Sequence, residues 1–398
     1  MGREETHSVA SPLSGLCVTY LILIAAFAVL PMLSLHVFLF GKQPLNDFLV
    51  YWTAGHFFSH GMNPYSAAMV RAFEVSMGYH GNPLPVIYPP WVLPIDALIA
   101  ALPFSLAHTA WFYTSVVLDL FSAFWLWKYF GGTTKTSWIA VLCVITYLPA
   151  IIAEQFGQIT PLILSGITAF LWLVRNKKMG WAGLALFVLA LKPHLFWLVI
   201  LAVGVWACKH KKFWLLLYPC LICAALTAYA FWKNPAVSGF FHEGVDTAGT
   251  VYCGLTGPLG AWGALHFPWL KYLPMLIALL WFIAYWRKHK EDWNWEEHFS
   301  LVILVSVASS PYYWGHDFLV ALPAMLLIVR RTCNWQKRWY LVPIFWSVLQ
   351  LLLLVCNGCS LVWMSAASVL WLLFWKLSHI CLQHTDKRAN TLNVAQEA

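Results

Sequence analysis

The chain has 398 residues, of which 61% are hydrophobic and only 10% are Asp, Glu, Lys or Arg. A soluble protein of this size carries about 25% charged residues, so these figures exclude a water-soluble globular fold and predict an all-α polytopic membrane protein. The net charge of +8 does not indicate a nucleic-acid partner, because the cations cluster in short loops, as membrane orientation requires.

The first predicted element is an apolar run over 16–40, which follows the polar segment Met1–Ser11. This run is long enough to stay as a membrane anchor and does not resemble a cleavable signal. Basic clusters farther along the chain mark cytoplasmic loops by the positive-inside rule. They lie at 175–178, 209–212, 287–290, 330–331 and 376–388. We expect the N-terminus on the cytoplasmic side as well.

A polar segment over 41–88 follows the first run and is not expected to cross the membrane. It contains Asp47 at the point where the first helix leaves the lipid, and an acid there is costly unless it is solvated, paired or functional. Apolar and aromatic residues then recur at helical spacing, at Phe48, Tyr51, Trp52, Phe57 and Phe58. This pattern predicts an interfacial helix on the membrane surface, which Gly61 and Asn63-Pro64 should end in a turn.

Apolar runs between the basic clusters predict the remaining spans. They cover residues 108–128, 137–153, 159–174, 213–231, 271–286, 299–312, 318–329, 339–355 and 360–377. Two other segments are ambiguous. Residues 89–106 hold four prolines and Asp96, and either cross once or dip into the membrane and return. Residues 181–206 are split by Lys192-Pro-His194, and form either one broken span or two short arms. We predict about nine to eleven spans in all.

These elements form one integral-membrane domain over 1–380, followed by a polar tail over 381–398 that we expect to be cytoplasmic and disordered. The polar segments at 41–88, 232–268 and 311–317 fall on the side opposite the basic clusters. The sequence has no P-loop, Gly-rich nucleotide motif or metal-binding cysteine framework. We therefore expect no metal and no nucleotide cofactor.

Three charged or titratable side chains carry the main chemical hypotheses. Asp47 is either a solvated boundary carboxylate or a general base that takes a proton from an attacking hydroxyl. Lys192, within an apolar stretch, is expensive in lipid and would hold a phosphate if the chain break lines a cavity. His316 beside Asp317 is either a packed polar cap or a phosphate ligand oriented by its neighbour.

Other polar and aromatic residues complete a possible substrate cavity. Gln158, in Glu154-Gln-Phe-Gly-Gln158, either bonds between helices or lines the cavity, because a buried amide needs a partner. The cavity candidates are Tyr51, Asn63, Tyr65, Tyr88, Gln158, His194 and Asp317. A base, two cations and an aromatic wall at one membrane face suit transfer of a sugar from a lipid phosphate, whose departure requires stabilisation of negative charge.

The order of these motifs resembles glycosyltransferase family 87, the polyprenol-phosphate-mannose-dependent mannosyltransferases. The resemblance covers about residues 45–325 and is carried by Asp47, Gly61-x-Asn-Pro-Tyr65, Tyr88-Pro-Pro90, Gly157-Gln158, Lys192-Pro, Ser310-Pro311 and His316-Asp317. It implies a GT-C fold, a conserved acid at Asp47, a late histidine at His316, and inversion from a β-linked donor to an α-glycoside. Mannose is the sugar of the best-known members, and no residue here selects it over another hexose.

The sequence therefore predicts a hexosyltransferase of the bacterial inner membrane with its active site on the periplasmic side. Its partners would be a polyprenyl-phosphate sugar, a lipid or glycan acceptor and membrane lipids. The main alternative is a transporter or flippase for a lipid-linked sugar, although such proteins usually show repeated halves and binding groups at mid-membrane. A structural subunit of an envelope-assembly complex is a third interpretation.

Overall fold

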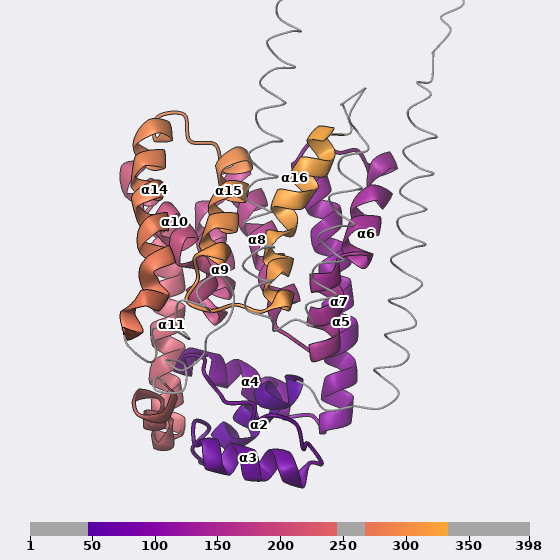
Figure 1. Ribbon diagram of the computed structural model, residues 1–398, viewed down its shortest axis with the longest axis vertical. Coiled ribbons are helices and arrows are strands. Elements are labelled where there is room, and N and C mark those ends of the chain that lie inside the picture. Colours follow the sequence, from indigo (N-terminus) through magenta and orange to yellow (C-terminus); the bar gives the residue numbers. More distant parts are fainter. Residues whose placement is uncertain (1–46, 245–266, 333–398) are drawn as a thin grey trace, which may run out of the picture.

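The computed structural model describes residues 47–244 and 267–332. Every regular element within these two ranges is a helix, which confirms the predicted all-α class. Figure 1 shows a tall helical bundle with a smaller layer of helices across one end. We call this smaller layer the cap layer; it consists of α2 (Phe48–Ser59), α3 (Ala67–Ser76) and α4 (Leu93–Ala100).

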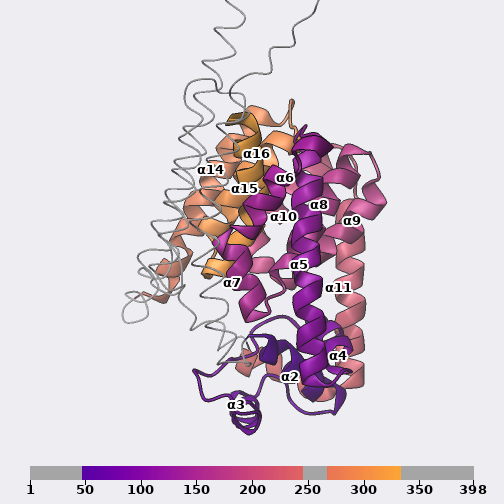
Figure 2. The ribbon, with the colours of Figure 1, turned by 90° about the vertical axis from the view of Figure 1, so that its right-hand side faces the viewer.

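The bundle contains the remaining α-helices. They are α5 (Phe104–Tyr129), α6 (Trp138–Ile145), α7 (Leu148–Phe156), α8 (Thr160–Arg175), α9 (Met179–Phe187), α10 (Trp197–Lys209), α11 (Trp214–Lys233), α14 (Leu273–His289), α15 (Trp295–Ala308) and α16 (Leu322–Thr332). Short 3-10 helices connect them: η1 (Pro90–Val92), η2 (Thr134–Thr136), η3 (Val188–Leu191), η4 (Pro193–Phe196), η5 (Pro235–Phe241), η7 (Pro268–Tyr272) and η8 (Gly315–Ala321). Figure 2 shows α5 and α11 reaching down to the cap layer.

Within the described ranges, three helices are long and apolar enough to cross a bilayer: Phe104–Tyr129, Trp214–Lys233 and Trp269–His289. The pair α6–α7, bent by 60°, would be a fourth span. Large apolar side chains on α5 and α11 are exposed, including Tyr113 at 65% and Trp232 at 78%. Such exposure is favourable when the surrounding solvent is lipid. The chain is therefore a polytopic membrane protein.

The predicted total of nine to eleven spans stays a prediction. It includes the apolar runs at 16–40, 339–355 and 360–377, which lie outside the described residues. The proposed tail over 381–398 and most of the 232–268 segment also lie outside them.

The basic loops at 175–178, 209–212, 287–290 and 330–331 gather at the end of the bundle away from the cap layer (Figure 1). Arg175, at the end of α8, donates to the carbonyl of Tyr129 at the end of α5. Arg330 of α16 donates to the carbonyl of Gly131, and its neighbour Arg331 pairs with Glu297 at 2.8 Å. These contacts bring Arg175 and Arg330-Arg331 to one end of the bundle, in agreement with the common side that the positive-inside rule predicts for the basic clusters.

The first ambiguous segment, residues 89–106, turns within the cap layer and does not run along the bundle. After η1, α4 packs against α2 within the cap layer (Figure 1), and α5 then enters the bundle from that same end. The two helices approach so closely at Gly55 that a Cβ there would lie 2.2 Å from the carbonyl oxygen of Asp96. Glycine is thus required for this contact.

The second ambiguous segment forms two short arms. Helix α9 continues into η3, the chain breaks at Lys192, and η4 leads into α10. Pro193 lacks an amide hydrogen and disfavours helical geometry in the residue before it, and Lys192 accordingly has φ −132° and ψ 66°. The indole of Trp91, beside the cap layer, donates to the carbonyl of Ala190 at 2.8 Å. The break is therefore held against the cap layer.

Helix α2 forms where the aromatic spacing predicted a helix, but it is covered on nearly every side. Phe48, Trp52 and Phe58 are each at most 9% exposed. The apolar side chains of α2 point to all sides of the helix instead of forming one stripe. The helix is therefore enclosed between neighbouring elements and does not lie with one face open to lipid. Asn234, at the end of α11, fixes it further by donating to the carbonyls of Phe58 and Met62.

Candidate active site

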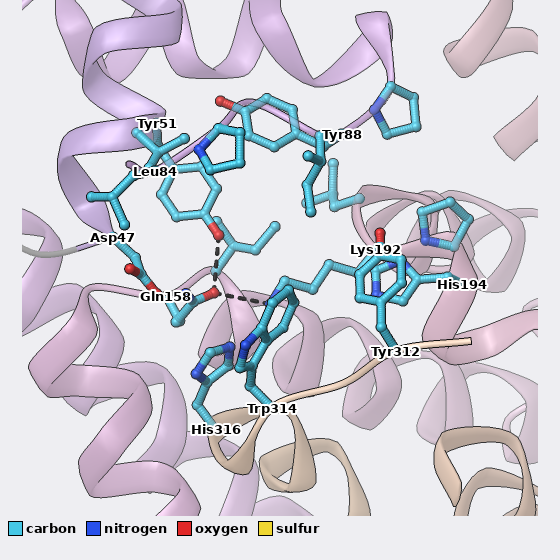
Figure 3. A pocket seen from close by; sticks show the side chains of 17 residues that line it. Asp47, Tyr51, Leu84, Tyr88, Gln158, Lys192, His194, Tyr312, Trp314 and His316 are labelled. Carbon is cyan, nitrogen blue, oxygen red and sulfur yellow. Dashed lines mark hydrogen bonds between the residues drawn. The ribbon is translucent and has the colours of Figure 1, made fainter. Parts of the chain in front are cut away.

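A cavity of about 370 Å³ lies between the cap layer and the bundle. Figure 3 shows side chains from five separate parts of the chain pointing into it. Its lining consists of Asp47, Val50, Tyr51, Leu84, Pro85, Ile87, Tyr88, Pro89, Gln158, Ile159, Leu191, Lys192, Pro193, His194, Tyr312, Trp314 and His316. The two polar segments at 41–88 and 311–317 therefore meet, as their predicted common side requires.

Most of the residues predicted as site candidates are brought together here. Those that line the cavity are Asp47, Tyr51, Tyr88, Gln158, Lys192, His194 and His316. Asp317 lies directly behind the lining, fully buried. Asn63 and Tyr65 do not line it. Asn63 donates to Glu243, and the Tyr65 hydroxyl donates to the carbonyl of Tyr88 at 3.1 Å, so Tyr65 supports the cavity wall from behind.

Tyr312 and Trp314 are part of the lining that the sequence did not single out. His194 stacks on Tyr312 with ring centroids 4.1 Å apart, and His316 lies parallel to Trp314 at 6.0 Å. The available signal was the aromatic run between Pro311 and His316. On another wall, Tyr51 and Tyr88 stack with centroids 5.6 Å apart. The cavity is thus walled by aromatic rings, which suit the apolar face of a sugar.

Five polar side chains at the cavity, those of Asp47, Tyr51, Gln158, Lys192 and Asp317, are connected by hydrogen bonds. Figure 3 shows the contacts of Gln158 with Tyr51 and Lys192. Gln158 Nε2 donates to Asp47 Oδ2 at 2.5 Å. Gln158 Oε1 accepts from Lys192 Nζ at 2.9 Å and from the Tyr51 hydroxyl at 3.0 Å. Lys192 Nζ also donates to Asp317 Oδ1 at 2.8 Å. The amide therefore connects Asp47 with the Lys192–Asp317 ion pair.

Asp47 precedes α2 and lies outside the membrane-spanning helices. Burial raises the pKa of its carboxyl from 3.8 to about 6, while the hydrogen bond from Gln158 and the charge of Lys192 act in the opposite direction. A carboxylate with this pKa is mostly ionised at neutral pH and is a stronger proton acceptor than an ordinary aspartate. Both properties suit a general base.

The position of Gln158 depends on the turn before it. Gly157 ends α7 in the left-handed conformation, with φ 63°, a geometry that side chains with a Cβ rarely adopt. Its carbonyl accepts from the Trp111 indole at 3.0 Å, and the Gln158 amide donates back to Ala153 at 2.8 Å. The Gly-Gln pair noted in the sequence is therefore the joint that aims this side chain into the cavity.

Lys192 is not a free cation. Its partner Asp317 also accepts from the Trp314 amide and faces His316 Nε2 at 3.6 Å. The Lys192 side chain keeps 11% of its surface exposed, whereas that of Asp317 has none. Lys192 is thus the nearest partner of Asp317. The contact between Asp317 and His316 is longer and weaker.

Two imidazole nitrogens in the cavity have no hydrogen-bond partner within the described part of the chain. They are Nε2 of His194 and Nε2 of His316, and both rings line the cavity. A buried polar nitrogen without a partner is costly, and a ligand oxygen would satisfy it. No group of His, Cys, Asp and Glu within 47–244 and 267–332 has the arrangement of a metal site.

The model of glycosyltransferase family 87 matches residues 87–311. This range includes Tyr88, Gln158, Lys192 and His194, whereas Asp47 and His316 lie outside it. No curated protein and no solved structure matches the chain. The family match covers more than half of the chain, and the described residues form a helical membrane protein with a cavity lined by polar and aromatic side chains. The chain therefore belongs to glycosyltransferase family 87 and is a membrane glycosyltransferase.

Proposed function

We propose that the protein transfers a hexose from a polyprenyl-phosphate sugar to a hydroxyl of a lipid or glycan acceptor, with inversion. The observation that carries this proposal is one cavity that contains a carboxylate with a raised pKa, a lysine, and two imidazole nitrogens to which no described residue makes a hydrogen bond. A glycosyl transfer from a lipid phosphate needs a proton acceptor for the incoming hydroxyl and stabilisation for the departing phosphate. Mannose is the sugar favoured by the family resemblance.

In the proposed reaction, Asp47 removes the proton from the acceptor hydroxyl as its oxygen attacks the anomeric carbon. The bond between that carbon and the phosphate oxygen breaks, and its electron pair leaves with the lipid phosphate. The transition state is oxocarbenium-like, because the bond to the phosphate oxygen is largely broken while the bond to the acceptor oxygen is only partly formed. The phosphate gains negative charge, which Lys192 and the Nε2 atoms of His194 and His316 would stabilise. The scheme uses no metal and no nucleotide.

The proposed location is the bacterial inner membrane, with the cavity open to the periplasm. The support is the separation of the basic loops from the cap layer (Figure 1). Cysteine introduced at exposed His60, in the cap layer, should react with a membrane-impermeant thiol reagent in intact spheroplasts of a strain expressing an otherwise cysteine-free protein. Cysteine at exposed Lys177, after α8, should react only after lysis. The reverse pattern would place the cavity on the cytoplasmic side.

The pH dependence of transfer should follow the ionisation of Asp47. The base acts as a carboxylate, so protonation removes activity, and the pKa of Asp47 is about 6. We expect kcat/KM to be flat above roughly pH 7 and to fall about tenfold per unit well below pH 6, because only the ionised fraction reacts. A pH–rate profile with the purified enzyme measures this. An acid limb centred near pH 4 would show an Asp47 carboxyl that burial does not perturb.

The proposed function itself is tested by direct transfer. Purified protein is incubated with radiolabelled polyprenyl-phosphate mannose, or with the glucose analogue, and an extract of envelope lipids. The expected result is a labelled acceptor product, with release of polyprenyl phosphate. Movement of the intact donor across proteoliposomes, without any transfer of its sugar, would instead support the flippase alternative.

A further inference from the structure

Gln158 occupies a central position in the cavity, yet the proposed reaction gives it no role. The residue is only 5% exposed, and its side chain makes three hydrogen bonds to three different groups. A buried amide needs partners wherever it lies. Here, however, the partners are the proposed base, the proposed phosphate cation and a tyrosine of the cavity wall.

The orientation of this amide is fixed by the chemistry of its neighbours. A lysine ammonium only donates hydrogen bonds, so the group facing Lys192 must be the amide oxygen. An ionised carboxylate only accepts them, so the group facing Asp47 must be the amide nitrogen. The two requirements agree, and the contacts of Nε2 with Asp47 and of Oε1 with Lys192 satisfy both.

This arrangement makes the two oxygens of Asp47 unequal. Oδ2 is occupied by the amide hydrogen of Gln158, whereas Oδ1 receives no hydrogen bond from the described part of the chain. A base must present one lone pair to the acceptor hydroxyl in a defined direction, and small displacements from that direction reduce the rate steeply. A hydrogen bond to one oxygen prevents rotation of the carboxylate and leaves the other oxygen for the proton.

We propose that Gln158 is a positioning residue, which holds Asp47 with Oδ1 directed at the acceptor hydroxyl and ties that base to the Lys192–Asp317 pair. This inference rests on the proposed function. It assigns Gln158 no contact with reacting atoms. The Gly157 turn and the hydrogen bond from Tyr51 keep the amide itself in place, so both sides of Gln158 are supported.

Only an amide of this length satisfies both neighbours. Methionine has similar bulk but cannot donate to Asp47. Glutamate keeps a contact with Lys192, yet it places a second carboxylate against Asp47, and two adjacent carboxylates cannot both ionise readily. Among the described residues, the other charged or titratable groups around Asp47 are Lys192, Asp317, His194, His316, Tyr51, Tyr79 and Tyr88. Neither substitution removes any of them.

The test compares Gln158→Met and Gln158→Glu with the wild-type enzyme, using the radiolabelled donor and acceptor extract. We expect Gln158→Met to lower kcat by roughly 10- to 100-fold with little change in the KM for the donor. The acid limb of its pH–rate profile should move to higher pH, because a hydrogen bond that favours the ionised base is lost. Gln158→Glu should move that limb farther in the same direction.

Gln155→Met is the matched control, because it makes the same substitution on α7 at a residue that does not line the cavity. It should retain the wild-type pH profile. Wild-type kcat and pH profile in Gln158→Met would overturn the inference, as would a loss that merely follows the amount of folded protein. If Gln158→Met does not fold, the pH–rate profile of Gln158→Glu tests the inference by itself. An acid limb at the wild-type pH in that variant would contradict it. A wild-type enzyme that transfers no sugar would refute the proposed function, which is a separate outcome.

Discussion

Replacing Asp47 by asparagine should lower the rate of sugar transfer by about 10²–10⁴-fold, the usual contribution of a general base. The substitution preserves the size of the side chain and removes the proton acceptor. Binding of the donor should hardly change, because the proposed phosphate ligands His194, His316 and Lys192 are untouched. Single-turnover rates and donor affinity, measured on the same purified sample, separate these two effects.

A matched control is Asp292→Asn, which makes the same chemical change at a carboxylate that is 73% exposed and lies outside the cavity. It should transfer sugar at the wild-type rate. If Asp47→Asn also keeps a near wild-type rate, Asp47 is a structural residue and the base must be another group.

Lys192→Met should reduce both turnover and stability, for different reasons. Turnover falls because the departing phosphate loses a cation. Stability falls because Asp317 is fully buried and loses its ion-pair partner at 2.8 Å. Removal of one partner of a buried pair typically costs about 3–5 kcal/mol. Thermal unfolding and activity per folded molecule measure the two effects independently.

The double variant Lys192→Met/Asp317→Asn separates the structural and chemical roles of the lysine. Asparagine removes the uncompensated charge, so the melting temperature should recover most of the loss seen in Lys192→Met. Turnover should stay low, because the phosphate still lacks its cation. Recovery of activity together with stability would mean that Lys192 serves only the ion pair and does not act on the phosphate.

Much of the fold was predictable because the constraints of a bilayer are local in sequence. The apolar runs predicted the helices. The basic clusters predicted that described loops such as 209–212 and 287–290 lie at the same end of the bundle. The segments 89–106 and 181–206 were ambiguous for a physical reason. A proline-rich apolar stretch satisfies the lipid whether it crosses or turns back, and only its packing partners, α2 for α4 and the cap layer for Lys192, decide between these outcomes.

The candidate site was predictable where an ionisable side chain lies beside or within an apolar run. Asp47 and Lys192 were identifiable because ionisable groups beside or within apolar runs need a reason to be there. The pairing of Lys192 with Asp317 was not, since 125 residues separate them and no local pattern encodes such a contact. Asn63 does not line this cavity, and its position in a turn did not reveal the direction of its side chain. Its Oδ1 accepts from the Tyr65 amide, which shapes the turn.

The link between α11 and the cap layer should make the proposed site sensitive to the thickness of the bilayer. Helix α11 has 20 residues and is therefore about 30 Å long, close to the hydrocarbon thickness of a typical membrane. A helix that is mismatched to its bilayer tilts to bury its apolar length. Because Asn234 fastens the end of α11 to the carbonyls of Phe58 and Met62, we expect such a tilt to displace α2 and, with it, the Asp47 carboxylate that precedes α2.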